Sequence, residues 1–153
     1  NKMPIVKKEK GSISEAFEEG KILLLVNNIN CAKDPKDDEK PELSKKLYKK
    51  FENIEEVHKS FPLPALYKLG DYSVASIAQS ASVLNFYTSL TNNEFEYSAL
   101  KSCLKKLSME GLSNGHYIEV SFCKKNIGDA EWKTVEQILH FQEQLLITVY
   151  DKN

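Results

Sequence analysis

The sequence predicts a three-layer α/β sandwich on a mixed, mostly parallel six-stranded sheet. Strand-like and helix-like patterns alternate along the chain, which is typical of this fold class. Residues 22–26 form a continuous apolar run, as expected of a strand that helices cover on both faces. The chain has 153 residues, of which 41% are hydrophobic and 28% are charged. Residues 1–153 are therefore expected to form a single domain. Its first residue is Asn rather than Met, so excision from a larger protein stays open.

The first three elements follow from apolar runs and capping residues. Residues 5–6 predict a short strand. The sequence Ser-Ile-Ser-Glu at residues 12–15 has the pattern of a capping box, which predicts a short helix ending near Gly20. Residues 21–26 then predict a buried strand, bounded by Asn27 and Asn28.

A charged loop and a long amphipathic stretch come next. The loop covers residues 31–41, and Pro41 suits the first turn of a helix. The apolar residues of this helix share one face and its lysines share the other, and the pattern continues to Pro62. The residues of the apolar face are Leu43, Leu47, Tyr48 and Phe51.

The middle of the chain predicts a hairpin followed by a polar segment. Residues 65–68 and 72–77 flank Gly70, which suits a tight turn between two strands. Residues 79–93 are polar, with a few large apolar side chains among them. Because aromatic anchors dominate protein interfaces, three of these are candidates for partner contact, although packing over the sheet edge explains them equally well. They are Phe86, Tyr87 and Leu90.

The last third of the chain completes the alternation. A helix is predicted from residue 92 or 93 to Glu110, with a strand over residues 117–122 after it. Asp129 is placed to cap another helix, and residues 145–150 form the closing strand.

Charge and composition narrow the function classes. All 21 basic residues are lysines and they face 22 acidic residues, for a net charge of -1. Nucleic-acid binding is therefore not expected, and an anion site would have to do without arginine. The apolar runs fall far short of the roughly 20 residues of a membrane span. Three cysteines without a C-x-x-C motif indicate a reducing intracellular compartment, nuclear or cytoplasmic.

The sequence predicts no metal site, cofactor or nucleophile motif. His58, His116 and His140 lie far apart, and none has a second ligand at a metal-binding spacing. There is also no Gly-x-Ser-x-Gly elbow. In open α/β folds ligands bind at the carboxyl ends of the strands, so the candidate ligand-binding residues follow the predicted strands. They are Asn28, Gln79, Ser80, Lys124, Lys125 and Asn126.

Taken in order, four stretches make the chain resemble a macrodomain, nearest the terminal ADP-ribose protein glycohydrolase branch. Residues 22–28 resemble the apolar strand before the family's first binding loop, and residues 43–51 resemble its lysine-rich helix. Residues 65–77 resemble its hairpin. The stretch from Gly128 to Trp132 and the closing strand resemble its C-terminal third. The resemblance implies a macrodomain-like sandwich that binds ADP-ribose.

The departures from the family pattern fall where the ligand would lie. Ser12 follows Gly11 where the family has an adenine-binding Asp, and residues 34–40 carry four carboxylates and no glycine. Gln79 or Ser80 stands in place of the glycohydrolase lysine. Asp129 lies near the position of the family's catalytic aspartate, where it is also placed to cap a helix.

These departures predict a degenerate macrodomain that acts as a non-catalytic protein-interaction module, with a protein as its partner. ADP-ribose binding is disfavoured, since lost backbone contacts and added negative charge both weaken diphosphate binding. The alternative is an ADP-ribose binder or mono-ADP-ribosyl-protein glycohydrolase with a divergent site, in which Asp129 would be the catalytic acid or nucleophile.

Overall fold

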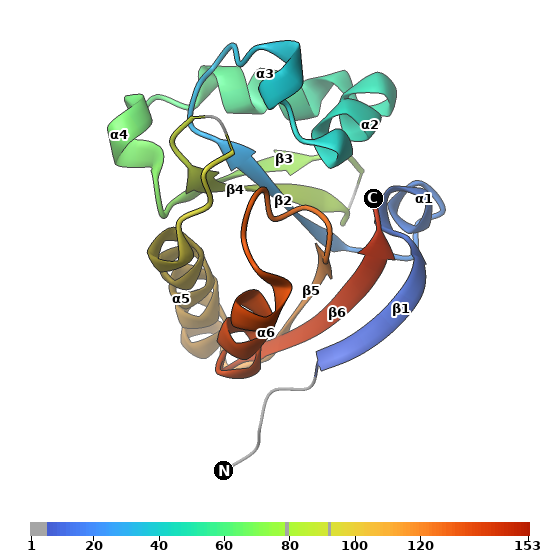
Figure 1. Cartoon of the computed structure of the whole chain (residues 1–153). Coiled ribbons are helices and arrows are strands. Elements are labelled where there is room, and N and C mark those ends of the chain that lie inside the picture. Colours follow the sequence, from blue (N-terminus) through green and yellow to red (C-terminus); the bar gives the residue numbers. More distant parts are fainter. Residues whose placement is uncertain (1–5, 79, 92) are drawn as a thin grey trace.

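In the computed structural model, which describes residues 6–78, 80–91 and 93–153, helices cover both faces of a six-stranded sheet (Figure 1). The strand order is β1-β6-β5-β2-β4-β3, and every neighbouring pair is parallel except β3 and β4. The fold class predicted from the sequence is thus confirmed. The strands are β1 (Val6–Ser12), β2 (Leu24–Asn30), β3 (Tyr72–Ser76), β4 (Ser82–Ser89), β5 (Ile118–Cys123) and β6 (Leu145–Lys152).

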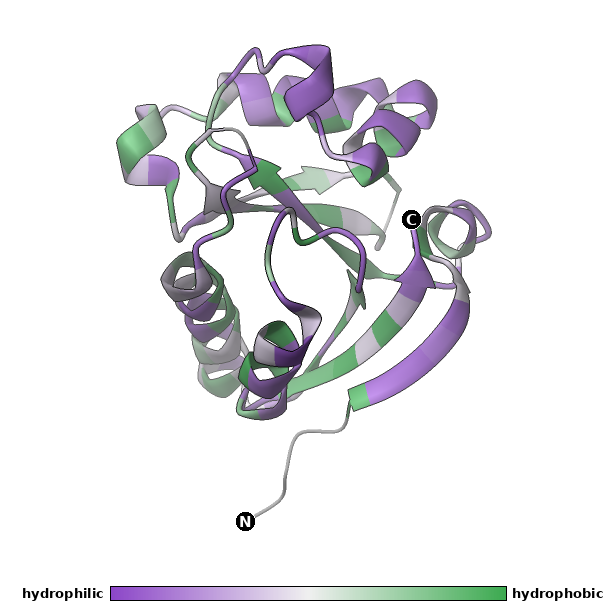
Figure 2. Cartoon of the chain, in the orientation of Figure 1, coloured by the Kyte–Doolittle hydropathy of each residue, from purple (hydrophilic) through white to green (hydrophobic). Residues whose placement is uncertain are grey.

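Two groups of helices form the outer layers. On one face, apolar residues of α1, α2 and α3 pack against Leu25 and Val83 of the sheet. On the other, α5 and α6 pack against Phe86 and Phe122. The hydrophobic parts of the helices accordingly turn toward the sheet, whereas the edge strand β1 is mostly hydrophilic (Figure 2). The helices are α1 (Ile13–Glu18), α2 (Glu42–Lys50), α3 (Glu52–Ser60), α4 (Ala65–Lys68), α5 (Tyr97–Asn114) and α6 (Trp132–His140).

Local signals set several element boundaries as predicted. The Ser12 hydroxyl accepts a hydrogen bond from the Glu15 amide at 3.3 Å, so Ser12 caps α1. Helix α5 runs past its predicted end at Glu110 to Asn114, and Gly115 follows with a φ of 73°, the left-handed conformation that glycine adopts without strain. Its start was predicted too early, because Asn93 lies before the helix and has a positive φ.

The strand β2 lies three to four residues later than predicted. The apolar run ends at Val26, but the strand continues to Asn30, and its asparagines are buried. Their amides have protein partners: Asn27 Nδ2 donates to Ser44 Oγ at 3.1 Å, and Asn30 Nδ2 donates to the Glu39 carbonyl at 3.1 Å. Polar residues can therefore occupy a central strand here, since hydrogen bonds offset their desolvation.

The predicted hairpin is wrong. Residues 65–68 form the short helix α4, and β3 pairs with β4, with Tyr72 opposite Phe86 and Ser76 opposite Ser82. The segment expected to be polar thus contains a buried strand next to β2 in the sheet.

The predicted exposure of two interaction candidates is wrong for the same reason. Phe86 and Tyr87 are both 0% exposed and lie on opposite faces of β4, where they belong to the core. Leu90, just past the strand, is 37% exposed. A contact with a partner through Phe86 and Tyr87 would require the sheet to open, so neither is an interface residue.

Candidate functional site

The carboxyl ends of β2, β4 and β5 meet at one edge of the sheet and border a polar cavity of about 200 Å³. Strand β2 contributes its last asparagines, β4 its last hydroxyl residues, and the loop after β5 the far wall. The lining residues are Asn28, Ile29, Asn30, Lys40, Pro41, Glu42, Thr88, Ser89, Asn93, Phe95, Lys125, Asn126 and Gly128. Three predicted ligand-binding residues, Asn28, Lys125 and Asn126, are thus brought together.

Asn28 and Asn126 bind each other across this edge. Asn28 N–H donates to Asn126 Oδ1 at 2.7 Å, and Asn28 Nδ2 donates to the Asn126 carbonyl at 2.9 Å. Asn126 Nδ2 donates back to the Asn28 carbonyl at 3.3 Å, and the Thr88 hydroxyl donates to Asn28 Oδ1 at 3.2 Å. All three side chains are buried. Their polar atoms are therefore engaged within the protein and brace the β2 end against the β5 loop.

The loop that follows β5 packs against the segment that follows β4. Gly128 has a φ of 55°, and a Cβ added to it would lie 2.5 Å from the Asn93 carbonyl oxygen. Asp129 Oδ1 accepts a hydrogen bond from the Phe95 amide at 2.8 Å. Asp129 does not cap α6 as predicted, because that position belongs to Glu131. The candidate catalytic carboxylate therefore holds a neighbouring loop in place.

The charged loop after β2 lies partly over the cavity. Lys40 and Glu42 line the cavity. The carboxylate of Asp34 lies 3.3 Å from Lys59, and that of Asp37 lies 3.7 Å from the lining Lys40 without lining the cavity itself. The expectation that four loop carboxylates crowd the ligand position is wrong, since only Glu42 among the acidic residues lines the cavity.

The remaining candidates lie outside this cavity. Gln79 is outside the described residues. Ser80 lies at the amino end of β4, on the opposite edge of the sheet, because β3 runs antiparallel to its neighbour. Lys124 is exposed and its Nζ stands 5.8 Å from the centre of the Trp132 ring. Neither Ser80 nor Lys124 is among the residues that line the cavity at the carboxyl edge.

Reasoning from sequence missed several lining residues, among them Asn30 and Thr88. Asn30 is 3% exposed, and its Oδ1 has no hydrogen-bond partner among the described residues. A buried, unpartnered acceptor is costly, and its presence beside a cavity marks a place for a donor. These lining residues could be recognised only once β4 was known to end at Ser89, next to β2.

A buried polar network anchors the charged loop that follows β2. Tyr87 Oη lies 3.0 Å from His58 Nδ1 and 3.0 Å from Ser73 Oγ, and His58 Nε2 lies 2.8 Å from the Ala32 carbonyl. Only a protonated Nε2 can donate to that carbonyl, so Nδ1 accepts from the tyrosine when the ring is neutral. Burial lowers the pKa of His58 below its ordinary value of 6.5 and raises the pKa of Tyr87.

Lys68 lies in the same region, and the sequence did not predict it as a functional residue. The side chain is fully buried, and Nζ donates to the Cys31 carbonyl at 3.3 Å and lies 5.3 Å from the centre of the Tyr87 ring. Burial lowers the pKa of Lys68 and raises the pKa of the Cys31 thiol to about 11. A thiol with this pKa stays protonated near neutral pH, so Cys31 is a poor nucleophile.

The network predicts that acidification destabilises the fold through His58. The folded pKa lies below the unfolded value, so stability is complete above pH 6.5 and is lost as pH falls further. The slope from one such group is at most about 1.4 kcal/mol per pH unit. Urea unfolding at pH 7.5 and 5.5 should show this loss, and His58→Gln should reduce it. His116→Gln, at an exposed histidine, should leave it unchanged; an unchanged slope in His58→Gln would contradict the assignment.

Metal and membrane features are absent from the described part of the chain. Within residues 6–78, 80–91 and 93–153, no three His, Cys, Asp or Glu side chains stand close enough to hold a metal ion. Among the helices in those ranges, none has the length and apolarity that crossing a bilayer requires.

Comparison of the sequence with protein families and with curated proteins finds no match. Solved structures do match. The macrodomain of Mycobacterium tuberculosis DarG has a TM-score of 0.73 at 15% identity, over 98% of this chain and 99% of that chain. A macrodomain protein from Streptomyces coelicolor has 0.73 at 12% identity, over 97% and 99%. Thermosipho africanus DarTG in complex with ADP-ribose has 0.71 at 13% identity, over 98% of this chain and 43% of that one.

These matches extend over nearly the whole chain and agree with the observed strand order and layers. Identities this low carry information about architecture alone. Together with the six-stranded mixed sheet and the cavity at its carboxyl edge, they identify the chain as a protein with the macrodomain fold.

Proposed function

We propose that this chain is a non-catalytic interaction module in which a macrodomain scaffold is kept and the ADP-ribose cleft is closed. The observation that carries the proposal is the direct hydrogen bonding of Asn28 to Asn126 across the carboxyl edge. A ligand that inserted between the ends of β2 and β5 would have to break these contacts and leave their buried groups unpaired, at about 1–3 kcal/mol for each.

The size of the cavity supports the same conclusion. Pockets for drug-sized ligands occupy about 300–1,000 Å³. The cavity here has about 200 Å³, which is less than a nucleoside diphosphate sugar requires. Two amides at this edge, Asn28 N–H and Phe95 N–H, are already bonded to side chains and are therefore not free to donate to a diphosphate.

The candidate catalytic group also lacks a partner suited to hydrolysis. Asp129 Oδ1 is bonded to the Phe95 amide. Of the two lysines expected near Asp129 for hydrolysis, Lys124 lies over Trp132, and Lys125 lines the cavity, whereas Asp129 is not among the lining residues. Under this proposal, the sequence pattern of the chain is most similar to that of the glycohydrolase branch, but the chain no longer catalyses the hydrolysis that defines the branch.

A second candidate function is ADP-ribose binding, with or without hydrolysis through Asp129. The unpartnered Oδ1 of Asn30 beside the cavity favours it, since a ribose hydroxyl would supply the missing donor. The resemblance of the fold to a structure in complex with ADP-ribose gives it further support. Lys40 and Lys125 would be the nearest cations.

Calorimetric titration with ADP-ribose separates the two candidates. We expect no saturable heat at micromolar ligand, and no release of ADP-ribose from a mono-ADP-ribosylated protein. Asn126→Ala, which removes two of the bracing hydrogen bonds, is the informative variant, and Asn53→Ala is its control at an exposed amide. Saturable binding by the unmodified chain, or hydrolysis that Asp129→Ala abolishes, would establish the second candidate instead.

A further inference from the structure

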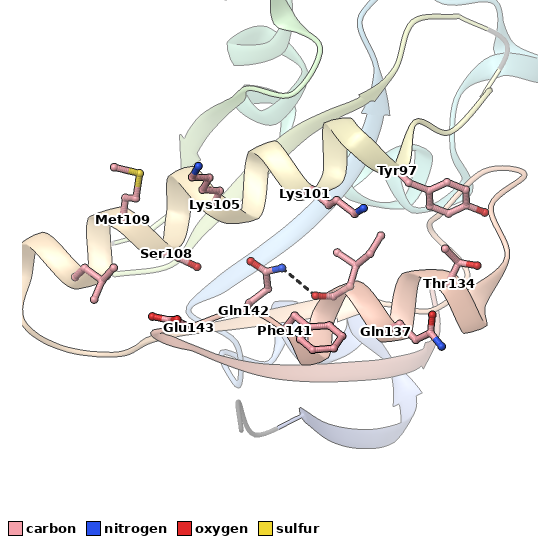
Figure 3. Close-up of a pocket in the computed structure, with 12 residues that line it drawn as sticks. Tyr97, Lys101, Lys105, Ser108, Met109, Thr134, Gln137, Phe141, Gln142 and Glu143 are labelled. Atoms are coloured by element: carbon pink, nitrogen blue, oxygen red, sulfur yellow. Dashed lines mark hydrogen bonds between the residues drawn. The ribbon is translucent and has the colours of Figure 1, made fainter. Parts of the chain in front are cut away.

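Helices α5 and α6 leave an open groove between them on the outside of the molecule. The hollow has a volume of about 750 Å³ and a largely apolar lining (Figure 3). Three large side chains at its rim are strongly exposed: Phe141 at 77%, Met109 at 56% and Leu112 at 53%. Exposed apolar patches of this kind mark interaction surfaces.

The two walls of the groove are regular helical stripes. Along α5 the lining residues run from Tyr97 to Leu112 at intervals of three or four, apart from the adjacent pair Ser108 and Met109, over a length of roughly 22 Å at 1.5 Å per residue. Across from them, Thr134 and Gln137 of α6 and Phe141, just past its end, line the opposite wall. A straight, apolar groove of about this length fits three to four turns of a third helix.

The α5 wall is positively charged. Lys101 and Lys105 stand one turn apart on the groove and are exposed, and neither forms an ion pair with a described residue. The neighbouring Lys106, outside the groove, does pair with Asp71 at 3.3 Å. Glu143 is the acidic residue in the lining and lies toward the end of the groove with Met109. The free charge over most of the groove therefore complements an acidic partner.

Ser108 gives an independent sign that something binds here. The residue lines the groove at 7% exposure, and its hydroxyl has no hydrogen-bond partner among the described residues. A buried serine in a helix usually donates to the carbonyl one turn earlier. Here that partner is missing among the described residues, so a buried hydroxyl directly beside the groove is left unsatisfied.

We propose that the α5–α6 groove binds an amphipathic helix of a partner protein, with the apolar face of that helix in the groove and Asp or Glu residues beside Lys101 and Lys105. This inference rests on the proposed interaction function and names its surface and partner chemistry. Phe141, Met109 and Leu112 form the apolar end of the contact. A basic helix and a second copy of this chain are the alternatives that the experiment excludes.

The test is selection from a display library of helical peptides of about 15 residues, the length that spans the groove. Apolar residues stand at i, i+3, i+4 and i+7, and the flanking positions vary equally between Glu and Lys. We expect enrichment of Glu in peptides that bind the full chain. Their affinity should fall at least tenfold with Lys101→Glu and Lys105→Glu combined, and at least tenfold with Phe141→Ser.

Matched controls use exposed positions elsewhere. Lys46→Glu combined with Lys50→Glu changes the same spacing on α2, and Leu66→Ser removes an apolar side chain that is 68% exposed on α4. Both should bind selected peptides as the unmodified chain does. Failure to enrich any peptide, or binding that the groove variants do not weaken, would overturn the inference. So would self-association of the chain that Phe141→Ser abolishes.

The two proposals fail separately. If ADP-ribose binds in the calorimeter while selected acidic helices still require Lys101 and Lys105, the closed cleft is refuted and the groove stands. If ADP-ribose does not bind and no acidic helix is selected, the groove is refuted and the closed cleft stands.

Discussion

Phe86→Ala should unfold the protein more readily than any substitution at the surface. Phe86 is fully buried between the sheet and the α5–α6 layer, and its ring lies 5.6 Å from that of Tyr72. Truncating a buried phenylalanine costs about 3–5 kcal/mol, from lost burial and from the cavity left behind. Urea unfolding monitored by circular dichroism should show a loss of this size in the free energy of unfolding.

Leu90→Ala is the matched control for this prediction. Leu90 lies in the same segment but is 37% exposed, so its truncation should change the free energy of unfolding by about 0.5 kcal/mol or less. Equal, small losses in both variants would mean that Phe86 lies at the surface. The position of β4 in the sheet would then be wrong.

Gly128→Ala should open the contact between the β5 loop and the segment after β4. Alanine in the left-handed conformation costs about 1–2 kcal/mol. In addition, its Cβ would stand 2.5 Å from the Asn93 carbonyl oxygen, so the loops must move apart and strain the bond between Asp129 and the Phe95 amide. The combined loss should reach about 2–4 kcal/mol.

Gly115→Ala separates the two contributions. Gly115 also has a positive φ, of 73°, but no atom lies within 4 Å of the Cβ position. Its substitution should cost the conformational part alone. A loss at Gly128 that is no larger than the loss at Gly115 would show that the loops are not in close contact, and that the cleft is less tightly closed than described.

The architecture was predictable because its determinants are local. Alternating patterns and the cap at Ser12 are read directly from neighbouring residues, and both are found in the structure. The buried helix faces follow from helical spacing in the same way. The predicted strand over residues 72–77 is also present, as β3, although its partner is not the one expected.

The candidate site was less predictable because distant partners determine it. Polar residues such as Asn28 and Asn30 are typical of a segment that follows a strand. Here they extend the strand because Asn126 and Glu39 form hydrogen bonds with their side chains. The same holds for β4, where Tyr87 is buried with the support of His58. Secondary-structure propensity depends on neighbouring residues, so it cannot predict such pairs, whose members are 9 to 98 residues apart in the chain.

The measurement that tests the closed cleft most directly is a crystal structure of the chain grown with excess ADP-ribose. The account predicts that no ADP-ribose binds at the carboxyl edge of β2, β4 and β5, and that Asn28 N–H still donates to Asn126 Oδ1 at about the 2.7 Å found here. An ADP-ribose molecule between the β2 and β5 loops, with Asn28 and Asn126 separated and turned toward it, would contradict the account.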